Sequence, residues 1–324
     1  MTDGPNWASP DQQPGPQPAA AAPPPPGWQT PPSPPKPGVI PLRPLGLGEI
    51  LDGAVSTMRR HPKLTLGISA IVVTVSQLLI LAGTYWLLDD IAAAATIDEN
   101  TPTDEVFALL GKSLTVIGIT LVVTLLFRVF LAGFLTIVVG KAVLGQPISF
   151  AEEWEQVRPR LLPLLGLTLV IPAIVFGAAV LVALLVVMIP PVGILLFIAA
   201  IPVAIWLFVL FSLATPALML EHATVGRAFG RSRLLVRGSW WRIFGITVLA
   251  SLLATVVALI INIPFNLIAG NNITLAAVTL TTVGAIISST VTEPFAAGVN
   301  VLLYTDQRIR REGMDIELAR AAAG

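Results

Sequence analysis

The chain has 324 residues, of which 55% are hydrophobic and only 12% are charged, and its formal net charge is zero. A soluble domain carries roughly 25% charged residues, so this composition cannot supply the polar surface of an ordinary soluble protein. The absence of cysteine excludes disulfides, thiolate nucleophiles and cysteine-based metal sites.

The first 45 residues are rich in proline and contain no apolar core of a secretory signal. Proline lacks a backbone N–H and has a fixed φ, so residues 23–38 cannot form a helix or a strand and should populate polyproline II. We therefore predict a disordered tail over residues 1–45. It is either a solvated spacer or a docking ligand for a cytoplasmic partner that recognises proline.

Six apolar segments follow, and each exceeds the roughly 20 residues that a helix needs to cross the hydrocarbon layer. They lie at residues 64–88, 114–139, 161–189, 192–219, 241–263 and 275–304. Only Pro190 and Pro191 separate the third from the fourth, which predicts a tight hairpin at the double proline. We predict an all-α transmembrane domain over residues 46–305 and a short charged tail, with a surface helix, over residues 306–324.

The distribution of basic residues predicts the orientation of the spans. Seventeen of the nineteen lysines and arginines precede the first span, follow the sixth or lie in alternate connections, and the exceptions are Lys112 and Arg128. Because cytoplasmic loops are enriched in Lys and Arg, this sorting predicts six crossings with both termini in the cytoplasm.

A weak threefold repeat precedes the first, third and fifth spans. In each copy an amphipathic stretch ends in an arginine, and a glycine follows eight residues later; the pairs are Arg59 and Gly67, Arg158 and Gly166, and Arg237 and Gly245. We predict three helical hairpins, each introduced by a short amphipathic helix that lies apolar face down in the headgroup plane. Repeats are common in transport proteins but also arise by plain duplication, so function stays open.

Two ionisable residues lie well inside spans, Arg128 in the second and Glu293 in the sixth. A charge at that depth costs about 2.5–3.5 kcal/mol on the insertion scale, so neither should face lipid. The sequence RVFLAG, which begins at Arg128, aligns with EPFAAG, which begins at Glu293, and equivalent positions in two repeats should lie at similar depth. We predict an intramembrane ion pair that either fixes helix packing or forms a substrate or proton site. In the second case Asn262 and Asn300 should line a cavity with it.

A cluster of arginines precedes the fifth span. The preference of basic residues for the cytoplasmic side is sufficient to explain it, but the cluster is also dense enough to bind anionic lipid headgroups. We expect the bilayer, and no nucleic acid, as its partner. The candidate lipid contacts are Arg227, Arg231, Arg233, Arg237 and Arg242.

Groups that could perform catalysis are scarce. No Ser/His pair lies within the spans, and Glu293 is the only acid available for an intramembrane carboxylate dyad. No HExxH, P-loop or GxGxxG motif occurs in a fitting context. We predict no catalytic residue, metal or cofactor, and a membrane-embedded lipid enzyme is our third hypothesis.

Four segments, which follow one another in the same order along the chain as in a known family, carry a resemblance to it: residues 41–62, 140–161, 225–245 and 302–318. The chain resembles the actinobacterial multi-pass membrane proteins labelled as having a glycerophosphoryl diester phosphodiesterase membrane domain, many of which carry a proline-rich N-terminus. The resemblance implies this topology and a bacterial plasma membrane. In the phosphodiesterases, catalysis belongs to a separate soluble barrel for which this chain has no room, so the resemblance implies no catalytic residues here.

Two main functions therefore remain open. The leading hypothesis is a non-enzymatic membrane protein that organises or assists envelope functions through its cytoplasmic face. It rests on the missing catalytic groups, the proline-rich tail and the basic helices. The alternative is a small transporter or channel-like protein that uses Arg128 and Glu293.

Overall fold

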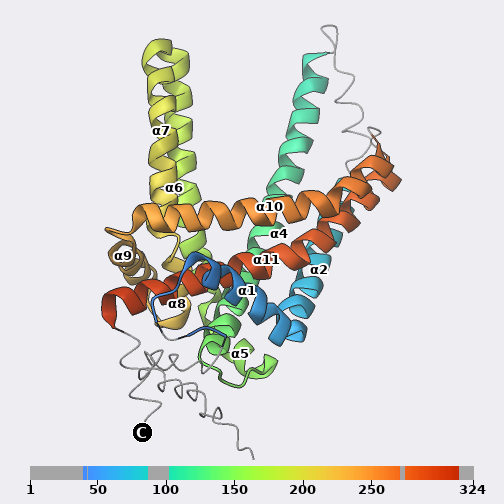
Figure 1. The fold of residues 1–324 in the computed structure, drawn as a ribbon. Helices are drawn as coiled ribbons and strands as arrows, with labels where there is room; N and C mark the ends of the chain where they lie inside the picture. The colour runs from blue at the N-terminus through green and yellow to red at the C-terminus, as the bar shows by residue number, and fades with distance from the viewer. Residues whose placement is uncertain (1–38, 42, 87–101, 271–273, 314–324) are drawn as a thin grey trace, which may run out of the picture. The chain divides into compact units, whose positions relative to one another are not determined.

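The computed structural model of the chain describes residues 39–41, 43–86, 102–270 and 274–313. Every regular element in these ranges is a helix, and six stretches are long and apolar enough to cross a membrane (Figure 1). The predicted all-α, six-span fold is thereby confirmed. The first 38 residues of the predicted tail lie outside the described residues. The six stretches are Lys63–Trp86, Val106–Val143, Phe150–Val186, Pro190–Leu220, Trp240–Ala269 and Leu275–Glu312.

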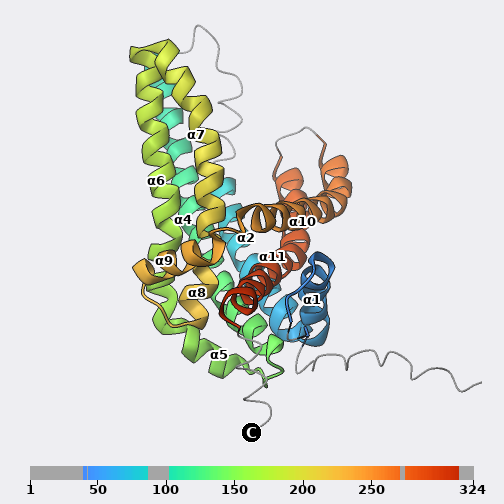
Figure 2. The same cartoon turned by 60° about the vertical axis from the view of Figure 1, so that its left-hand side comes forward.

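Three hairpins form the spans: α2 with α4, α6 with α7, and α10 with α11, each pair in direct contact. Figures 1 and 2 both show α6 and α7 side by side. A single π-helical turn, Lys63–Gly67, precedes α2. The α-helices are α1 (Leu47–Arg60), α2 (Ile68–Trp86), α4 (Thr103–Val143), α5 (Phe150–Val157), α6 (Leu161–Met188), α7 (Pro190–Phe211), α8 (Ala214–Leu220), α9 (Val225–Val236), α10 (Trp240–Ala269) and α11 (Leu275–Glu312).

The hairpin predicted at the double proline is confirmed. Helix α6 ends at Met188 and α7 begins at Pro190. The N–H groups of the first turn of a helix have no acceptor within the helix, so proline, which lacks an N–H, is well tolerated at this position. A Cβ added at Gly193 would lie 2.3 Å from the Cα atom of Val186. The two backbones therefore touch just after the turn, and only glycine permits this contact.

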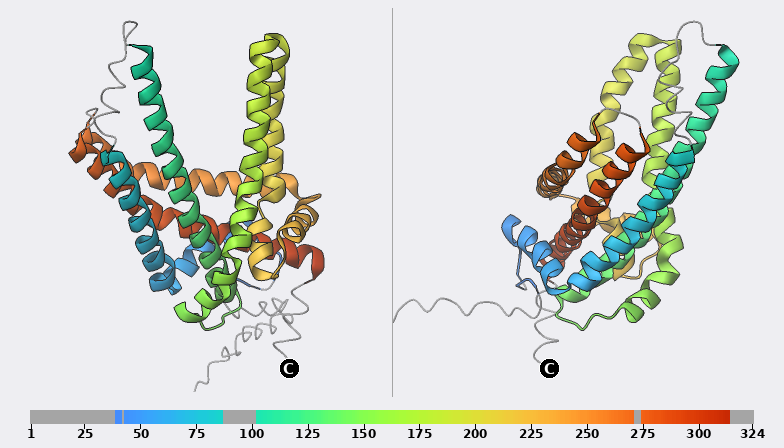
Figure 3. Two further views of the ribbon diagram at one scale, coloured as in Figure 1. Left: turned by 180° about the vertical axis from the view of Figure 1, so that it is seen from behind. Right: turned by 90° about the vertical axis from the view of Figure 1, so that its right-hand side faces the viewer.

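The short helices α1, α5 and α9 precede the three hairpins as predicted, but their most buried residues contact other helices of the chain. Ile50 and Ala54 of α1 are fully buried, and α1 packs along α11 (Figure 3). A Cβ added at Gly298 of α11 would lie 3.0 Å from the Cβ of Ala54. Helix α9 likewise buries Leu235 and packs on α7 and α11. The expectation that these helices turn their apolar faces to the headgroups is wrong for these residues, because a protein surface covers them.

The packing at the two ends of the chain differs from the predicted domain boundaries. Ile40 is only 1% exposed and Leu45 is fully buried, so the core begins before residue 46. We call residues 39–41 and 43–45 the strap. At the other end α11 continues through Glu312, and Asp306 and Gln307 are fully buried, so residues 306–312 extend the sixth helix instead of forming a separate surface tail.

The core lies toward one end of the spans, which we call the basic end because the flanking Lys63, Lys141, Arg158, Arg242 and Arg308 lie there. It contains the second half of α4, the last third of α11 and the short α8. The outer parts of α6 and α7 are exposed along most of their length, as apolar helices facing hydrocarbon can be. The largest fully buried side chains include Phe134, Leu135, Leu164, Leu218, Met219 and Tyr304.

Candidate functional site

A cavity of about 290 Å³ lies among α2, α4 and α11, and both predicted intramembrane charges line it. Glu293 lies near the middle of α11, and the lining residues of α2 and α4 also lie within their spans. Apolar residues make up five of the eleven lining positions. The other six are Ser76, Gln77, Thr124, Arg128, Ser289 and Glu293.

Helical spacing brings these polar residues to one place. Ser289 and Glu293 are four residues apart on α11, as are Thr124 and Arg128 on α4, and residues four apart share one face of a helix. The contacts of α2 with both α4 and α11 place Gln77 against these two faces. The cavity is therefore shared between the first hairpin and the third.

Arg128 and Glu293 contact each other across the cavity through a single carboxylate oxygen. The Oε1 atom of Glu293 lies 3.2 Å from Nη2 and 3.4 Å from Nε of Arg128. The strongest arginine–carboxylate pairs instead use two short parallel bonds to both oxygens. The Arg128 side chain is 68% exposed and that of Glu293 is 30% exposed. The pair is thus loosely held, and its guanidinium can take another acceptor.

The four uncharged polar side chains of the cavity make no hydrogen bond with any described residue: Ser76, Gln77, Thr124 and Ser289. Some hydroxyl groups elsewhere in the spans donate to the carbonyl oxygen four residues earlier, at 2.9 Å for Thr84, 2.6 Å for Thr136 and 2.7 Å for Thr290, whereas the buried hydroxyl of Ser69, outside the cavity, has no partner among the described residues. Unsatisfied polar groups cost several kcal/mol each in a bilayer. The cavity therefore presents several polar groups that water or the polar atoms of a ligand could satisfy.

The two asparagines expected in the cavity do not line it, so this prediction is wrong. Asn262 lies on α10, and its Nδ2 donates to the Oγ of Ser288 at 2.9 Å, which joins α10 to α11. Asn300 is half-buried on α11, beyond the last residue of that helix that borders the cavity, Glu293. Asn300 follows Glu293 by seven residues and so lies on the same face of α11, but the cavity ends before that position.

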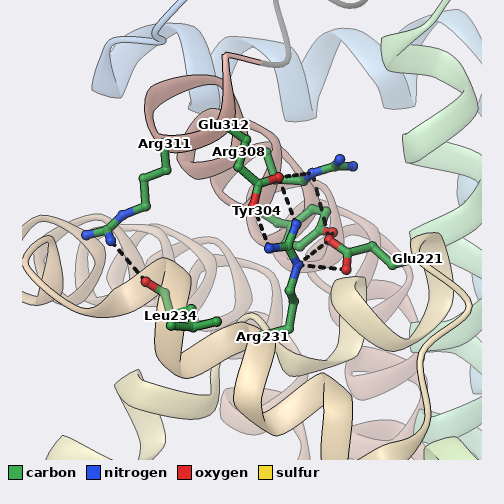
Figure 4. A network of polar contacts seen from close by, with 7 residues as sticks. All are labelled: Glu221, Arg231, Leu234, Tyr304, Arg308, Arg311 and Glu312. Carbon is green, nitrogen blue, oxygen red and sulfur yellow. Dashed lines mark hydrogen bonds and ion pairs between the residues drawn. The ribbon is translucent and has the colours of Figure 1, made fainter.

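The predicted lipid-contacting arginines divide into two groups. Arg231 lies between two carboxylates: its Nε is 2.7 Å from Oε2 of Glu221, and its Nη1 is 2.5 Å from Oε1 of Glu312 (Figure 4). Hydrogen bonds to Glu221, and then to Glu312, raise the pKa of Arg231 above its ordinary value. Tyr304 donates its hydroxyl to the same Glu221, and Arg308 pairs with Glu312 at 3.0 Å. Arg231 is therefore neutralised inside the protein.

Arg242 is also occupied within the chain, because it pairs with the buried Asp306 and donates to the carbonyl of Leu45 at 2.7 Å. Arg227, Arg233 and Arg237 remain exposed on α9 and at its C-terminal end. Only these three keep the geometry expected of headgroup contacts.

Several polar residues that matter in the structure were missed from the sequence. Gln77 lines the cavity, and its position as the one amide of an apolar span was a signal for it. The Glu153 side chain is fully buried, and its Oε1 lies 2.8 Å from Nζ of Lys141. Helical spacing was a signal for it, because Glu153 shares a face with Phe150 and the buried Val157, whereas the neighbouring Glu152 follows the helix cap Ser149 and is exposed. Within the described ranges, no group of three or more acidic or histidine residues is placed to hold a metal ion.

A family model described as "Domain of unknown function (DUF7847)" matches residues 45–307 of the chain. The match begins in the strap at Leu45 and takes in the first five spans and the sixth as far as Gln307, including Arg128 and Glu293. No curated protein and no solved structure matches the chain.

Proposed function

We propose that this chain, which belongs to the family described as a domain of unknown function (DUF7847), is a small transporter that binds a polar solute in the cavity of Arg128 and Glu293. One observation carries the proposal: uncharged polar side chains that make no hydrogen bond with any described residue lie beside a charged pair at mid-span. A purely structural pair would be enclosed by packed side chains and would satisfy its own hydrogen bonds.

The position of the cavity supports the same proposal. Transporters built from internal repeats bind their substrates near the bilayer midplane, where two repeats meet. Here α2 and α4 belong to the first hairpin and α11 to the third, and the mid-span Glu293 is followed directly by Pro294. Proline removes one backbone hydrogen bond from the helix, so α11 can bend next to the carboxylate.

The charges and volume of the cavity indicate the class of solute. Arg128 and Glu293 together carry no net charge, so a solute with a net charge would leave one charge uncompensated within the span. A net-neutral polar solute or a compact zwitterion would leave the site neutral. At about 30 Å³ for each water, 290 Å³ corresponds to roughly ten waters, so the part of a solute that the cavity encloses has about ten heavy atoms or fewer.

The remaining parts of the proposal rest on sequence. The basic end faces the cytoplasm of a bacterial plasma membrane, which places both termini there; this is supported by the sorting of seventeen of the nineteen basic residues. The resemblance to the glycerophosphoryl diester phosphodiesterase membrane domain supports a membrane domain that works without a catalytic barrel. We accordingly propose a protein that is not an enzyme.

A second candidate function rests on a different observation. Arg227, Arg233 and Arg237 are exposed and make no ion pair with the described residues, so they are available to anionic headgroups. With a proline-rich tail that recruits a cytoplasmic partner, the chain would organise envelope functions at this face. This role is compatible with transport.

A thermal-stability screen in lipid nanodiscs tests the proposed function. The probes are small solutes of four classes: glycine and glycine betaine as zwitterions, glycerol as a neutral polyol, acetate as an anion and methylammonium as a cation. We expect a zwitterion or the polyol to raise the melting temperature of the native chain but not of Gln77→Leu. Stabilisation by only a charged ion would contradict the solute class, and equal effects on native chain and variant would contradict the site.

A further inference from the structure

We infer that the strap is a latch that closes the cavity toward the basic end of the spans. The assignment of a transport cycle to this closure rests on the proposed function, whereas the closure itself does not. Three sets of contacts lead to the inference.

First, the strap connects the helices that form the cavity. The backbone N–H of Val39 donates to the carbonyl of Ala142 on α4 at 3.3 Å, and that of Leu45 donates to Oδ1 of Asp306 on α11 at 2.8 Å. Helix α4 carries Arg128, and α11 carries Glu293. The strap then enters α1, which leads into α2, the third helix of the cavity. One short segment therefore holds the basic ends of all three helices.

Second, a single carboxylate holds much of the strap. Asp306 is fully buried, pairs with Arg242 and accepts from Nε of Arg310 at 2.9 Å. The same two arginines donate to the carbonyl of Leu45, at 2.7 Å from Arg242 and 2.9 Å from Arg310. Both backbone polar groups of Leu45 are thus bound by charged side chains and not by regular secondary structure. Loss of the Asp306 charge would remove the ionic partner of two guanidinium groups that also bind the carbonyl of Leu45.

Third, a dry layer separates the cavity from the strap. A Cβ added at Gly53 of α1 would lie 2.8 Å from Cδ1 of Leu302 and 2.9 Å from Cγ2 of Ile40, so these three residues interlock. The layer closes the side of the cavity toward the basic end. Between the cavity and the strap, α4 and α11 bury Phe134, Leu135, Val138, Val299, Val301 and Leu303.

Among the described residues, no comparable layer of buried side chains lies on the opposite side of the cavity. There α4 exposes most of its apolar side chains, and Arg128 itself is 68% exposed. Among the described residues, only the basic end of the cavity is closed, as in one state of an alternating-access cycle. Release of Leu45 from Asp306 would let Ile40 move away from Leu302 and would loosen the packing of the layer.

Site-specific labelling of a cavity residue tests the latch, and the chain has no cysteine to interfere. Ser289→Cys places one thiol in the cavity, and a membrane-impermeant maleimide is added to vesicles whose basic end faces outward. The separate variant Arg233→Cys reports this orientation by its own labelling. We expect slow labelling of Ser289→Cys alone and labelling at least about tenfold faster when Asp306→Asn is added, because loss of the buried charge releases the strap.

Arg43→Ala is the matched control within the strap. Its exposed ion pair with Glu49, at 2.6 Å, is separate from the Asp306 contacts, so labelling should stay slow. If Asp306→Asn fails to fold, Ile40→Ala is the alternative variant. It removes the packing of Ile40 near Leu302 without changing a charge, and labelling should again be faster.

Fast labelling of Ser289→Cys with an unaltered strap would contradict the latch. Equal labelling rates in the folded strap variants and in the Arg43→Ala control would also contradict it. A latch confirmed by labelling in a protein that binds none of the test solutes would instead leave the closure intact and contradict only the proposed function.

Discussion

Arg128 on α4 and Glu293 on α11 contact each other through one carboxylate oxygen, 165 residues apart in sequence and beside a cavity that their own helices form. The remaining oxygen of Glu293 and the other nitrogen of the guanidinium are not used in this contact. A pair in this state can exchange one protein contact for a solute contact at low cost, because the site stays neutral throughout.

The energetics of the pair separate a structural role from a binding role. We expect Arg128→Leu and Glu293→Leu each to lower stability in detergent, and the double variant to recover part of the loss. Removal of one partner of a fully buried pair costs about 3–5 kcal/mol, and this exposed, single-oxygen pair should cost less. Chemical denaturation of the four proteins measures the coupling. Purely additive losses would show that the two charges do not interact.

Gln77→Leu should leave the stability of the chain unchanged or slightly higher, because the Gln77 side chain makes no hydrogen bond with any described residue and leucine adds apolar contact. Thr84→Val is the matched control, since Thr84 lies on the same helix, outside the cavity, and does make a hydrogen bond, to Ile80 at 2.9 Å. Denaturation midpoints compare the two. A larger loss for Gln77→Leu than for Thr84→Val would mean that Gln77 serves the fold and not a ligand.

The arginines of α9 should fall into two functional groups. Replacement of Arg227, Arg233 and Arg237 by glutamine should weaken the enrichment of a fluorescent anionic lipid around the protein in mixed nanodiscs, most clearly at low salt, with little change in stability. Arg231→Gln should instead lower the stability of the protein and change the lipid enrichment little, because it leaves Glu221 and Glu312 without their shared partner. Equal lipid enrichment after the triple replacement would remove the lipid-binding role.

Truncation should show where the tail ends. Deletion of residues 1–38 should leave membrane insertion and stability nearly unchanged, as expected for a proline-rich segment with few apolar residues. Deletion of residues 1–45 should destabilise the chain by several kcal/mol, because full burial of a side chain such as Ile40 or Leu45 contributes about 1.5–3 kcal/mol. Quantification of inserted, monodisperse protein distinguishes the two. Equal behaviour would place the strap outside the stable core.

Composition and local periodicity were sufficient to predict the six spans, the hairpin at Pro190 and the short helices, because these features depend on hydrophobicity and on proline. The repeat alignment also indicated that Arg128 and Glu293 would meet. The features that were predicted wrongly depend on contacts between residues far apart in the sequence. Leu45 is bound by Asp306, 261 residues away, and no local pattern shows that pairing. Asn262 instead binds Ser288 on α11, a contact between neighbouring helices that the sequence of either helix alone does not show.

The reactivity of a cysteine in the cavity tests the central claim most directly. Ser289→Cys should react with a small hydrophilic thiol reagent added from the side opposite the basic end, and a saturating solute of the correct class should slow the reaction. Leu126→Cys, on an exposed position of α4 that does not line the cavity, should stay unreactive because hydrocarbon surrounds it. Equal, solute-independent reactivity at the two positions would contradict a hydrated binding site at Arg128 and Glu293.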